Sequence, residues 1–182
     1  MKLMLKRIKT KLSIGVIILL FILVLFIPIQ TALVFYHPNT SKVAAYLPIH
    51  IDDRFQIIFT HSIHLTDVVE KYEVLEDLTI KQYEIVFEEF GIGMPSGAGE
   101  GESFVQEDGK YYIKNMNRIF PSINIRNGKV VSQHRLVWGK YAEHLVPFND
   151  YLEPGARYTM RINRLSLWQS LRGVKISDEK QR

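Results

Sequence analysis

The strongest constraint on this chain is an uncharged stretch. Leu12–Tyr36 contains 25 consecutive residues without Asp, Glu, Lys, Arg or His. A helix of about 20 apolar residues can cross the roughly 30 Å hydrocarbon core of a bilayer, and it satisfies its own backbone hydrogen bonds there. We therefore predict a transmembrane helix over residues 12–36, preceded by a short arm and followed by one folded domain of ordinary size.

The distribution of charge predicts the orientation of this helix. Residues 1–11 carry five basic side chains and no acidic one, whereas the remaining 18 Lys and Arg residues face all 19 Asp and Glu residues. Basic residues beside a membrane helix favour the cytoplasmic side, so we expect a cytoplasmic arm and an extracytoplasmic domain in the cell membrane. A nucleic-acid partner is not expected, because the domain itself has no basic excess.

The composition also restricts the chemistry of the domain. The chain has no cysteine, which excludes disulfides, thiolate metal sites and a cysteine nucleophile. An exported domain without disulfides fits a bacterial surface better than a eukaryotic secreted module. We expect no cofactor.

A cleaved signal peptide is the alternative to a retained anchor. The apolar region of a signal peptide usually has 7–15 residues, which is shorter than the run found here. The best small-residue cleavage site, Val43–Ala45, lies well beyond the apolar run and follows Lys42. We therefore favour a retained, single-pass anchor.

The rest of the chain has the pattern of β-structure. We expect a linker and lead-in strand over 37–53, a β domain over 54–173 and a polar tail over 174–182. Alternating apolar residues predict strands at Arg54–Thr60 and within Leu78–Phe90. Asp108-Gly109 and Asn127-Gly128 each predict a two-residue hairpin turn, because both central residues of a type I′ turn need positive φ.

The last element has helical spacing. Leu165, Trp168 and Leu171 lie three residues apart, so we predict a short C-terminal helix there. The predicted fold class is all-β, an antiparallel sandwich or open barrel of seven to nine short strands.

The first candidate site follows the strand at Arg54–Thr60. The segment contains two histidines, a serine and two carboxylates, namely His61, Ser62, His64, Asp67 and Glu70. Its simplest interpretation is a polar connection in which His61 and Ser62 hold a turn. The alternatives are a partner or ligand contact, a metal site using His61 and His64, and a hydrolytic set of His61, Ser62 and Asp67.

The second candidate site is the glycine-rich segment Gly91–Gly101. It lacks the Gly-Lys-Ser/Thr ending of a phosphate-binding P-loop, and it carries Glu100, which would repel phosphate. A flexible surface loop and a loop that contacts a partner remain the two interpretations. The partner-contact interpretation involves Gly91, Gly93, Met94 and Pro95.

The third candidate is Trp168 in the predicted C-terminal helix. This helix either docks on the sheet or lies at the membrane surface, since Trp and Arg suit the membrane interface. The chain shows no set of residues typical of a catalytic site, so we do not expect an enzyme.

Several motifs together resemble a known family. They are His61-Ser62 after a strand, Glu70, the run Phe90–Pro95, the run Asp108–Arg118 and the late Leu167–Gln169. This pattern is similar to the prokaryotic family called domain of unknown function 1850, over most of Arg54–Gly173. Many members have Val-Glu after His-Ser, whereas this chain has Ile63-His64.

The resemblance implies a role in transport. Members are often encoded beside the permease and the solute-binding protein of TAXI-type TRAP transporters. The expected function is therefore an accessory subunit that contacts the permease, the solute-binding protein or both on the outer face of the membrane. The alternative is an extracytoplasmic sensor or a ligand- or metal-binding module without a link to transport.

Overall fold

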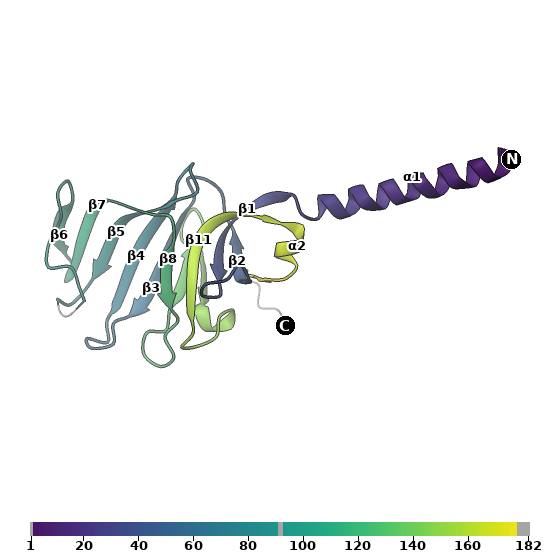
Figure 1. Cartoon of the computed structure of the whole chain (residues 1–182). Coiled ribbons are helices and arrows are strands. Elements are labelled where there is room, and N and C mark those ends of the chain that lie inside the picture. The colour runs from purple at the N-terminus through teal and green to yellow at the C-terminus, as the bar shows by residue number, and fades with distance from the viewer. Residues whose placement is uncertain (1, 91–92, 178–182) are drawn as a thin grey trace.

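The chain forms a β sandwich with a helix extending from one side (Figure 1). This computed structural model describes the backbone of residues 2–90 and 93–177, with side chains from residue 11 onward. Helix α1 (Lys2–Val24) leads into the sandwich, and helix α2 (Leu167–Ser170) lies where α1 meets the domain. A 3-10 helix, η1 (Phe148–Asp150), precedes the last long strand.

The described residues form twelve strands in two sheets. In spatial order, the five-stranded sheet consists of β12 (Val174–Lys175), β2 (Val43–Pro48), β1 (Pro28–Tyr36), β11 (Arg157–Ser166) and β8 (Ile123–Arg126). The seven-stranded sheet consists of β10 (His144–Pro147), β9 (Arg135–Trp138), β3 (Arg54–Thr60), β4 (Asp67–Val74), β5 (Ile80–Phe87), β7 (Lys110–Phe120) and β6 (Ser103–Glu107). Neighbouring strands are antiparallel except β12 and β2, which are parallel.

The hydrophobic core lies between the two sheets. Leu33 and Phe35 of β1 contribute from one side, and Phe55, Ile57 and Tyr72 contribute from the other. A second buried cluster lies farther along the seven-stranded sheet and consists of Val68, Ile85, Phe87, Ile113 and Met116. The strands β7 and β6 lie at the end of the domain opposite α1 (Figure 1).

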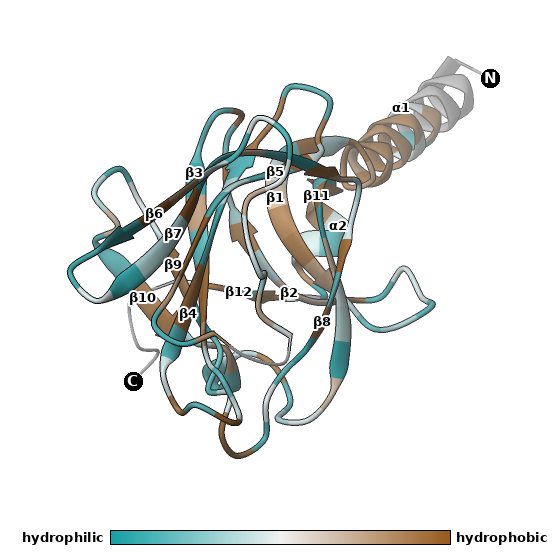
Figure 2. Cartoon of the chain, turned by 90° about the vertical axis from the view of Figure 1, so that its left-hand side faces the viewer, coloured by the Kyte–Doolittle hydropathy of each residue, from teal (hydrophilic) through white to brown (hydrophobic). Residues whose placement is uncertain are grey.

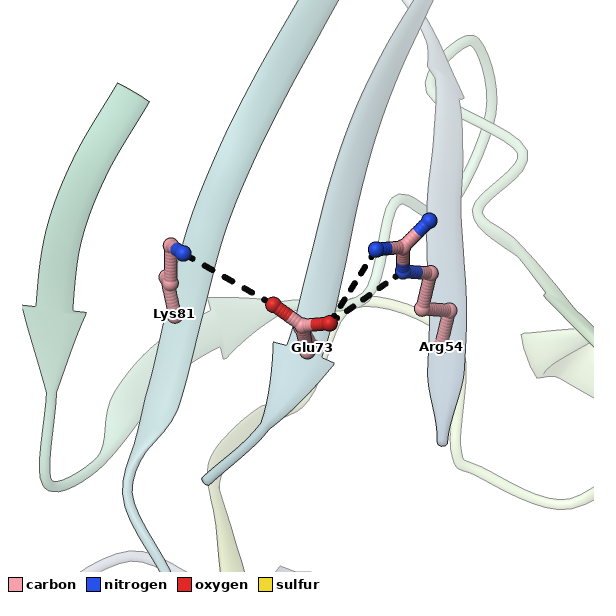
Figure 3. Close-up of polar contacts among 3 residues, drawn as sticks. All are labelled: Arg54, Glu73 and Lys81. Atoms are coloured by element: carbon pink, nitrogen blue, oxygen red, sulfur yellow. Dashed lines mark hydrogen bonds and ion pairs between the residues drawn. The ribbon is translucent and has the colours of Figure 1, made fainter. Parts of the chain in front are cut away.

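The outer face of the seven-stranded sheet carries ion pairs between neighbouring strands. Glu73 of β4 lies between Arg54 of β3, at 3.2 Å, and Lys81 of β5, at 3.7 Å (Figure 3). Lys71 pairs with Glu84 at 2.6 Å on the same face. The alternation of strands β3 to β5 therefore separates a charged outer face from a mainly apolar inner face.

The predicted transmembrane helix over 12–36 is corrected by the structure. Helix α1 ends at Val24, and Pro28–Tyr36 is the strand β1, whose second half is fully buried. The uncharged run continues across this boundary because the inner strand of a sandwich and a membrane helix are both apolar. Within the described part of the chain, none of the helices combines the length and apolar character that crossing a bilayer requires.

The β domain also extends beyond the predicted boundaries of 54 and 173. Strands β1 and β2 form the middle of the five-stranded sheet, so the region before residue 54 is an integral part of the sandwich rather than a linker. At the other end, β12 adds to β2, and Ile176 is buried in the core, where a polar tail was predicted. Residues 178–182 of that tail lie outside the described residues.

One predicted hairpin is present and the other is wrong. Asp108 and Gly109 have φ of 49° and 75° and join β6 to β7, as the Asp-Gly turn predicts. Asn127-Gly128 instead begins a crossing from β8 in one sheet to β9 in the other. The side chain of Asn127 is fully buried and donates to Asn149 Oδ1 and to the carbonyl oxygen atoms of Leu152 and Glu153, at 2.9–3.2 Å.

The sandwich is confirmed, but the described residues form twelve strands where seven to nine were predicted, and two details of the strands also differ. A bulge after Gln82 shifts the alternation of β5, so that Gln82 and Ile85 both face inward. The predicted C-terminal helix has only four residues, and Leu165 belongs to β11. Short segments and bulges of this kind depend on contacts across the sheet, which periodicity does not report.

Candidate functional site

The connection between β3 and β4 is a tight turn held by His61. The backbone N–H of His61 donates to Thr66 O at 2.8 Å, and the N–H of Leu65 donates to His61 O at 2.9 Å. The His61 Nδ1 accepts from the N–H groups of Ile63 and His64, at 3.4 and 3.3 Å. The ring of His61 therefore stabilises the turn, while Ser62 and Ile63 face solvent.

The two histidines stack rather than converge on one point. Their ring centroids lie 4.8 Å apart with an interplanar angle of 23°. The Nε2 atom of His64 is buried and has no hydrogen-bond partner. The described residues hold no group of three His, Cys, Asp or Glu side chains placed to bind a metal ion.

Asp67 is the first residue of β4 and belongs to the outer face. Its carboxylate accepts from Arg135 at 2.6 Å and from the Thr60 hydroxyl at 3.0 Å. Burial alone would raise the pKa of Asp67, but these hydrogen bonds and the charge of Arg135 hold it below its usual value. Its contacts tie β3, β4 and β9 together at the strand ends.

The glycine-rich segment folds against the second buried cluster. Met94 packs against this cluster, which includes Val68 and Phe87, and Gly93 has φ of 88°, a conformation that favours glycine. Pro95 is half-buried. Gly91 lies outside the described residues, so its predicted role remains a prediction.

An aromatic cluster lies beside this segment. Phe90 contacts Tyr111, with ring centroids 4.3 Å apart, and Phe87 and Phe104, at 5.4 and 5.8 Å. Phe90 and Phe104 remain exposed. This aromatic cluster offers an apolar contact surface on β5, β6 and β7.

Glu70 faces the interior, unlike the other acidic residues of β4. It belongs to the inward row Val68, Glu70, Tyr72 and Val74, and it borders a pocket of about 300 Å³ between the two sheets. The polar residues that line this pocket are Glu70, Tyr72, Gln82, Asn124, Arg126 and His134. The pocket therefore combines a carboxyl, a phenol, two amides, a guanidinium and an imidazole.

The electrostatics of Glu70 are set by burial. Burial raises the pKa of Glu70, and the hydrogen bond from the Tyr72 hydroxyl, at 2.9 Å, only partly opposes this effect. Burial and the neighbouring Glu70 carboxylate raise the pKa of Tyr72. Among the described residues, no Lys, Arg or His forms an ion pair with Glu70.

His134 also lines this pocket. Its ring stacks on Phe59 and Phe148, with centroid distances of 5.5 and 5.6 Å, and its Nδ1 accepts from the Gly128 N–H at 3.2 Å. Burial lowers the pKa of His134, and the charge of Arg135 adds to this effect. The ring is therefore neutral near pH 7, with its proton on Nε2.

The pocket joins only one predicted site residue, Glu70, to residues that the sequence did not single out. Strand β4 begins at Asp67, so its alternation Val68-Glu70-Tyr72-Val74 was the available signal for an inward carboxyl. The remaining pocket residues come from β3, β4, β5, β7, β8 and the segment before β9. No local pattern links these segments.

Trp168 lies apart from all other predicted site residues. It belongs to α2, its backbone N–H donates to Leu25 O at 3.0 Å, and its ring centroid lies 5.9 Å from that of Phe26. The predicted residues thus divide between the β3–β4 turn with the glycine-rich segment, the inner pocket, and the junction with α1.

Comparison with known proteins gives one match. The sequence model of the family described as "Domain of unknown function (DUF1850)" matches residues 55–145. These residues include the β3–β4 turn, Glu70, the glycine-rich segment and His134. No curated protein and no solved structure matches the chain.

Proposed function

The chain belongs to the DUF1850 family, and on that premise we propose that it is a membrane-anchored accessory subunit of a TAXI-type TRAP solute transporter. In this proposal the N-terminus is cytoplasmic and the β domain contacts the permease, the solute-binding protein or both on the outer face. The role is recognition rather than catalysis.

The observation that carries the anchoring is the exposure of α1. Between Leu12 and Val24 the large apolar side chains are 44–69% exposed, and this part of the helix is almost entirely hydrophobic (Figure 2). Soluble monomers rarely leave an apolar surface of this size in water. A lipid environment would cover it on all sides, and the basic arm before it favours a cytoplasmic N-terminus.

The connection between helix and domain supports a fixed position near the membrane. Only residues 25–27 separate α1 from β1, and β1 lies in the middle of the five-stranded sheet. A short connection to a buried strand keeps the β domain close to the bilayer, where a transporter partner has a high effective concentration.

The contact surface that we propose combines the β3–β4 turn with the glycine-rich segment and the aromatic cluster. The turn exposes Ser62 and Ile63, and the aromatic cluster exposes Phe90 and Phe104. These features lie on the seven-stranded sheet, which extends away from α1 (Figure 1). Exposed aromatic and apolar groups are typical of protein interfaces.

Purification in mild detergent tests this function. We expect a tagged full chain, produced at native level, to bring down a polytopic permease or its solute-binding protein in near-stoichiometric amount. Phe90→Ser should weaken this association, whereas Lys140→Ser, on an exposed loop, should not. Recovery of the chain alone after crosslinking would contradict the transporter role.

A second function is favoured by the inner pocket. Glu70 is half-buried and has no ion-pair partner among the described residues, so a ligand with an ammonium group or a metal ion would neutralise its charge. This observation supports the alternative of an extracytoplasmic ligand-binding module that is not tied to transport. We expect such ligands to raise the unfolding temperature of the full chain in detergent.

The matched variants for this test are Glu70→Gln and Glu73→Gln. The first removes the inward charge and the second removes an outward charge on the same strand. Stabilisation by small amines or divalent cations should disappear in Glu70→Gln and persist in Glu73→Gln. Equal loss in both variants would contradict a site at Glu70.

A further inference from the structure

The apolar part of α1 is too short to cross a bilayer by itself. Its helical, uncharged portion runs from Leu12 to Val24. At 1.5 Å per residue this portion covers about 20 Å, whereas the hydrocarbon core is roughly 30 Å thick. Basic residues on the cytoplasmic side can extend toward the headgroups, but they recover only part of the difference.

An exposed apolar surface surrounds the point where α1 enters the domain. It consists of residues between α1 and β2 and of residues in and beside α2, and we call it the apolar collar: Phe26, Ile27, Ile29, Leu167, Trp168 and Leu171. Leu171 is 77% exposed and Ile29 is 64% exposed. Phe26 and Ile27 of the collar lie in the connection between α1 and β1, so the collar begins where α1 ends.

The collar has a defined structure. The Trp168 N–H donates to Leu25 O, which ties α2 to the end of α1. Ser166 and Gln169 form a reciprocal capping box that fixes the start of α2, with N···O distances of 3.0 and 3.3 Å. The hydrogen bond to Leu25 and the ring contact between Phe26 and Trp168 therefore join the two segments that supply the collar.

Cationic side chains border the collar. The guanidinium of Arg172 lies over the Trp168 ring, 5.5 Å from its centroid. Beside Trp168 is a pocket of about 390 Å³ lined by Lys42, Arg172 and the hydroxyl-bearing Thr40 and Ser41. Tryptophan and arginine suit the boundary between lipid chains and headgroups, and Lys and Arg favour anionic headgroups.

We propose that the apolar collar lies in the outer interface of an anionic bilayer, with Trp168 at the headgroup level and Lys42 and Arg172 facing lipid phosphates. This inference deepens the proposed function and rests on its membrane anchoring. In this arrangement the collar adds to the length of apolar surface in the bilayer, which α1 alone does not fill. The β domain is then in contact with the membrane surface.

The two tryptophans of the chain provide the test. Trp138 lies in β9 of the seven-stranded sheet and Trp168 lies in the collar. The full chain is reconstituted alone into vesicles of phosphatidylcholine and phosphatidylglycerol, with or without bromine atoms high on the acyl chains. Quenching in the wild type is compared with quenching in Trp168→Phe, and the difference reports Trp168 without altering Trp138.

We expect Trp168 to lose about half of its emission in brominated vesicles, because interfacial tryptophans lie beside the upper acyl chain. Trp168→Phe should show little quenching. Leu171→Glu, at an exposed position, should reduce the quenching of Trp168 while the far-ultraviolet circular dichroism stays unchanged.

Alkaline extraction of the same vesicles separates the two proposals. A chain that resists extraction but shows equal quenching in wild type and Trp168→Phe would keep its anchor and overturn the collar docking. That result would place the collar outside the bilayer. A chain that is released by alkali would overturn the anchor and the docking together.

Discussion

Glu70 and Glu73 belong to the same strand, yet the two faces of the sheet give them opposite surroundings. Glu73 faces outward and contacts Arg54 and Lys81 (Figure 3). Glu70 faces the other sheet, where the Tyr72 hydroxyl is its hydrogen-bond partner and burial raises its pKa. The same side chain thus forms ion pairs on the outer face at one position and is a half-buried acid without an ion pair at the other.

This difference indicates which carboxyl is more informative about function. Exposed ion pairs contribute little to stability and need no further explanation. A carboxyl that is kept inside without a cation carries a cost in free energy, and perturbed groups of this kind concentrate at binding and catalytic sites. The inner face of β4 is therefore the better place to search for a ligand.

The largest expected difference in unfolding free energy is between alanine variants of Tyr72 and Lys71, which lie on opposite faces of β4. Tyr72 is buried and stacks on Phe55, with ring centroids 5.2 Å apart. Tyr72→Ala should lower the free energy of unfolding by about 3–5 kcal/mol, as for other buried aromatic residues. Lys71→Ala, on the outer face, should change it by less than about 1 kcal/mol. Urea unfolding in mild detergent measures both, and similar losses would contradict the assignment of faces.

The next prediction concerns how the stability of the domain changes with pH when Glu70 can ionise and when it cannot. Its pKa is raised above 4.5 in the folded state, so its contribution is most favourable below pH 4.5 and is lost as the pH rises through the folded-state pKa. Glu70→Gln still accepts from Tyr72 but cannot ionise. It should be more stable than the wild type at pH 7, because the wild type has to hold an ionised carboxyl in a half-buried site there.

The control for this prediction is Glu73→Gln. It should keep the decrease in stability between pH 4.5 and 7 that the wild type shows. The measurement is a series of unfolding curves across this range. A wild type and a Glu70→Gln variant with parallel pH profiles would mean that Glu70 is solvated.

The sequence allowed the sandwich to be predicted because its signals are local. The alternation of Arg54–Thr60 and the Asp108-Gly109 turn depend on neighbouring residues, and both have the predicted structure. Asn127-Gly128 has the same local signal, yet the fully buried Asn127 side chain binds the segment 149–153 instead. At this position the contacts of the buried side chain with a segment distant in sequence outweighed the local preference for a hairpin turn.

The boundary of α1 illustrates a second limit of the sequence. An uncharged apolar run is compatible with a membrane helix and with an inner strand, and hydropathy does not separate them. The structure divides Leu12–Tyr36 between α1 and β1, and the strand assignment of 28–36 follows from its pairing with β2 and β11. β-branched and aromatic residues such as Thr31, Val34 and Phe35 were the available signal.

The candidate site was predicted only in part for the same reason. The turn around His61 is continuous in sequence, and its structural interpretation agrees with the hydrogen bonds to Ile63 and His64. The pocket around Glu70 combines residues from both sheets, including His134 and Asn124. Such a set is created by the packing of the sheets, so it has no signature in a single segment.

Asp67 is the third acidic residue of β4, and its pKa is shifted in the opposite direction to that of Glu70. Its pKa is lowered from 3.8 by Arg135 and Thr60, so its contribution is present above pH 3.8 and is lost as the pH falls through the folded-state pKa. Asp67→Asn should cost about 0.2–1 kcal/mol at pH 7, the range for exposed ion pairs.

The cost of Asp67→Asn should vanish in acid, in the opposite direction to the effect of Glu70→Gln. Unfolding curves at pH 7 and at the lowest pH at which the chain stays folded measure this difference. Thr60→Val removes only the hydroxyl that donates to Asp67. At pH 7 it should lower the free energy of unfolding by less than Asp67→Asn does. A cost that is equal at both pH values would assign Asp67 a packing role.

The smallest expected effect concerns the ion pairs of Glu73. A double-mutant cycle with Arg54→Ala and Glu73→Ala should give a coupling energy below about 0.5 kcal/mol, because the Arg54 side chain is 63% exposed and water screens the pair. The coupling should decrease further in about 1 M salt, where the Debye length is about 3 Å. A salt-independent coupling of more than about 1 kcal/mol would mean that the outer face is shielded from water. Glu73 would then resemble Glu70, and the distinction between the two faces of β4 would no longer identify the pocket as the more informative site.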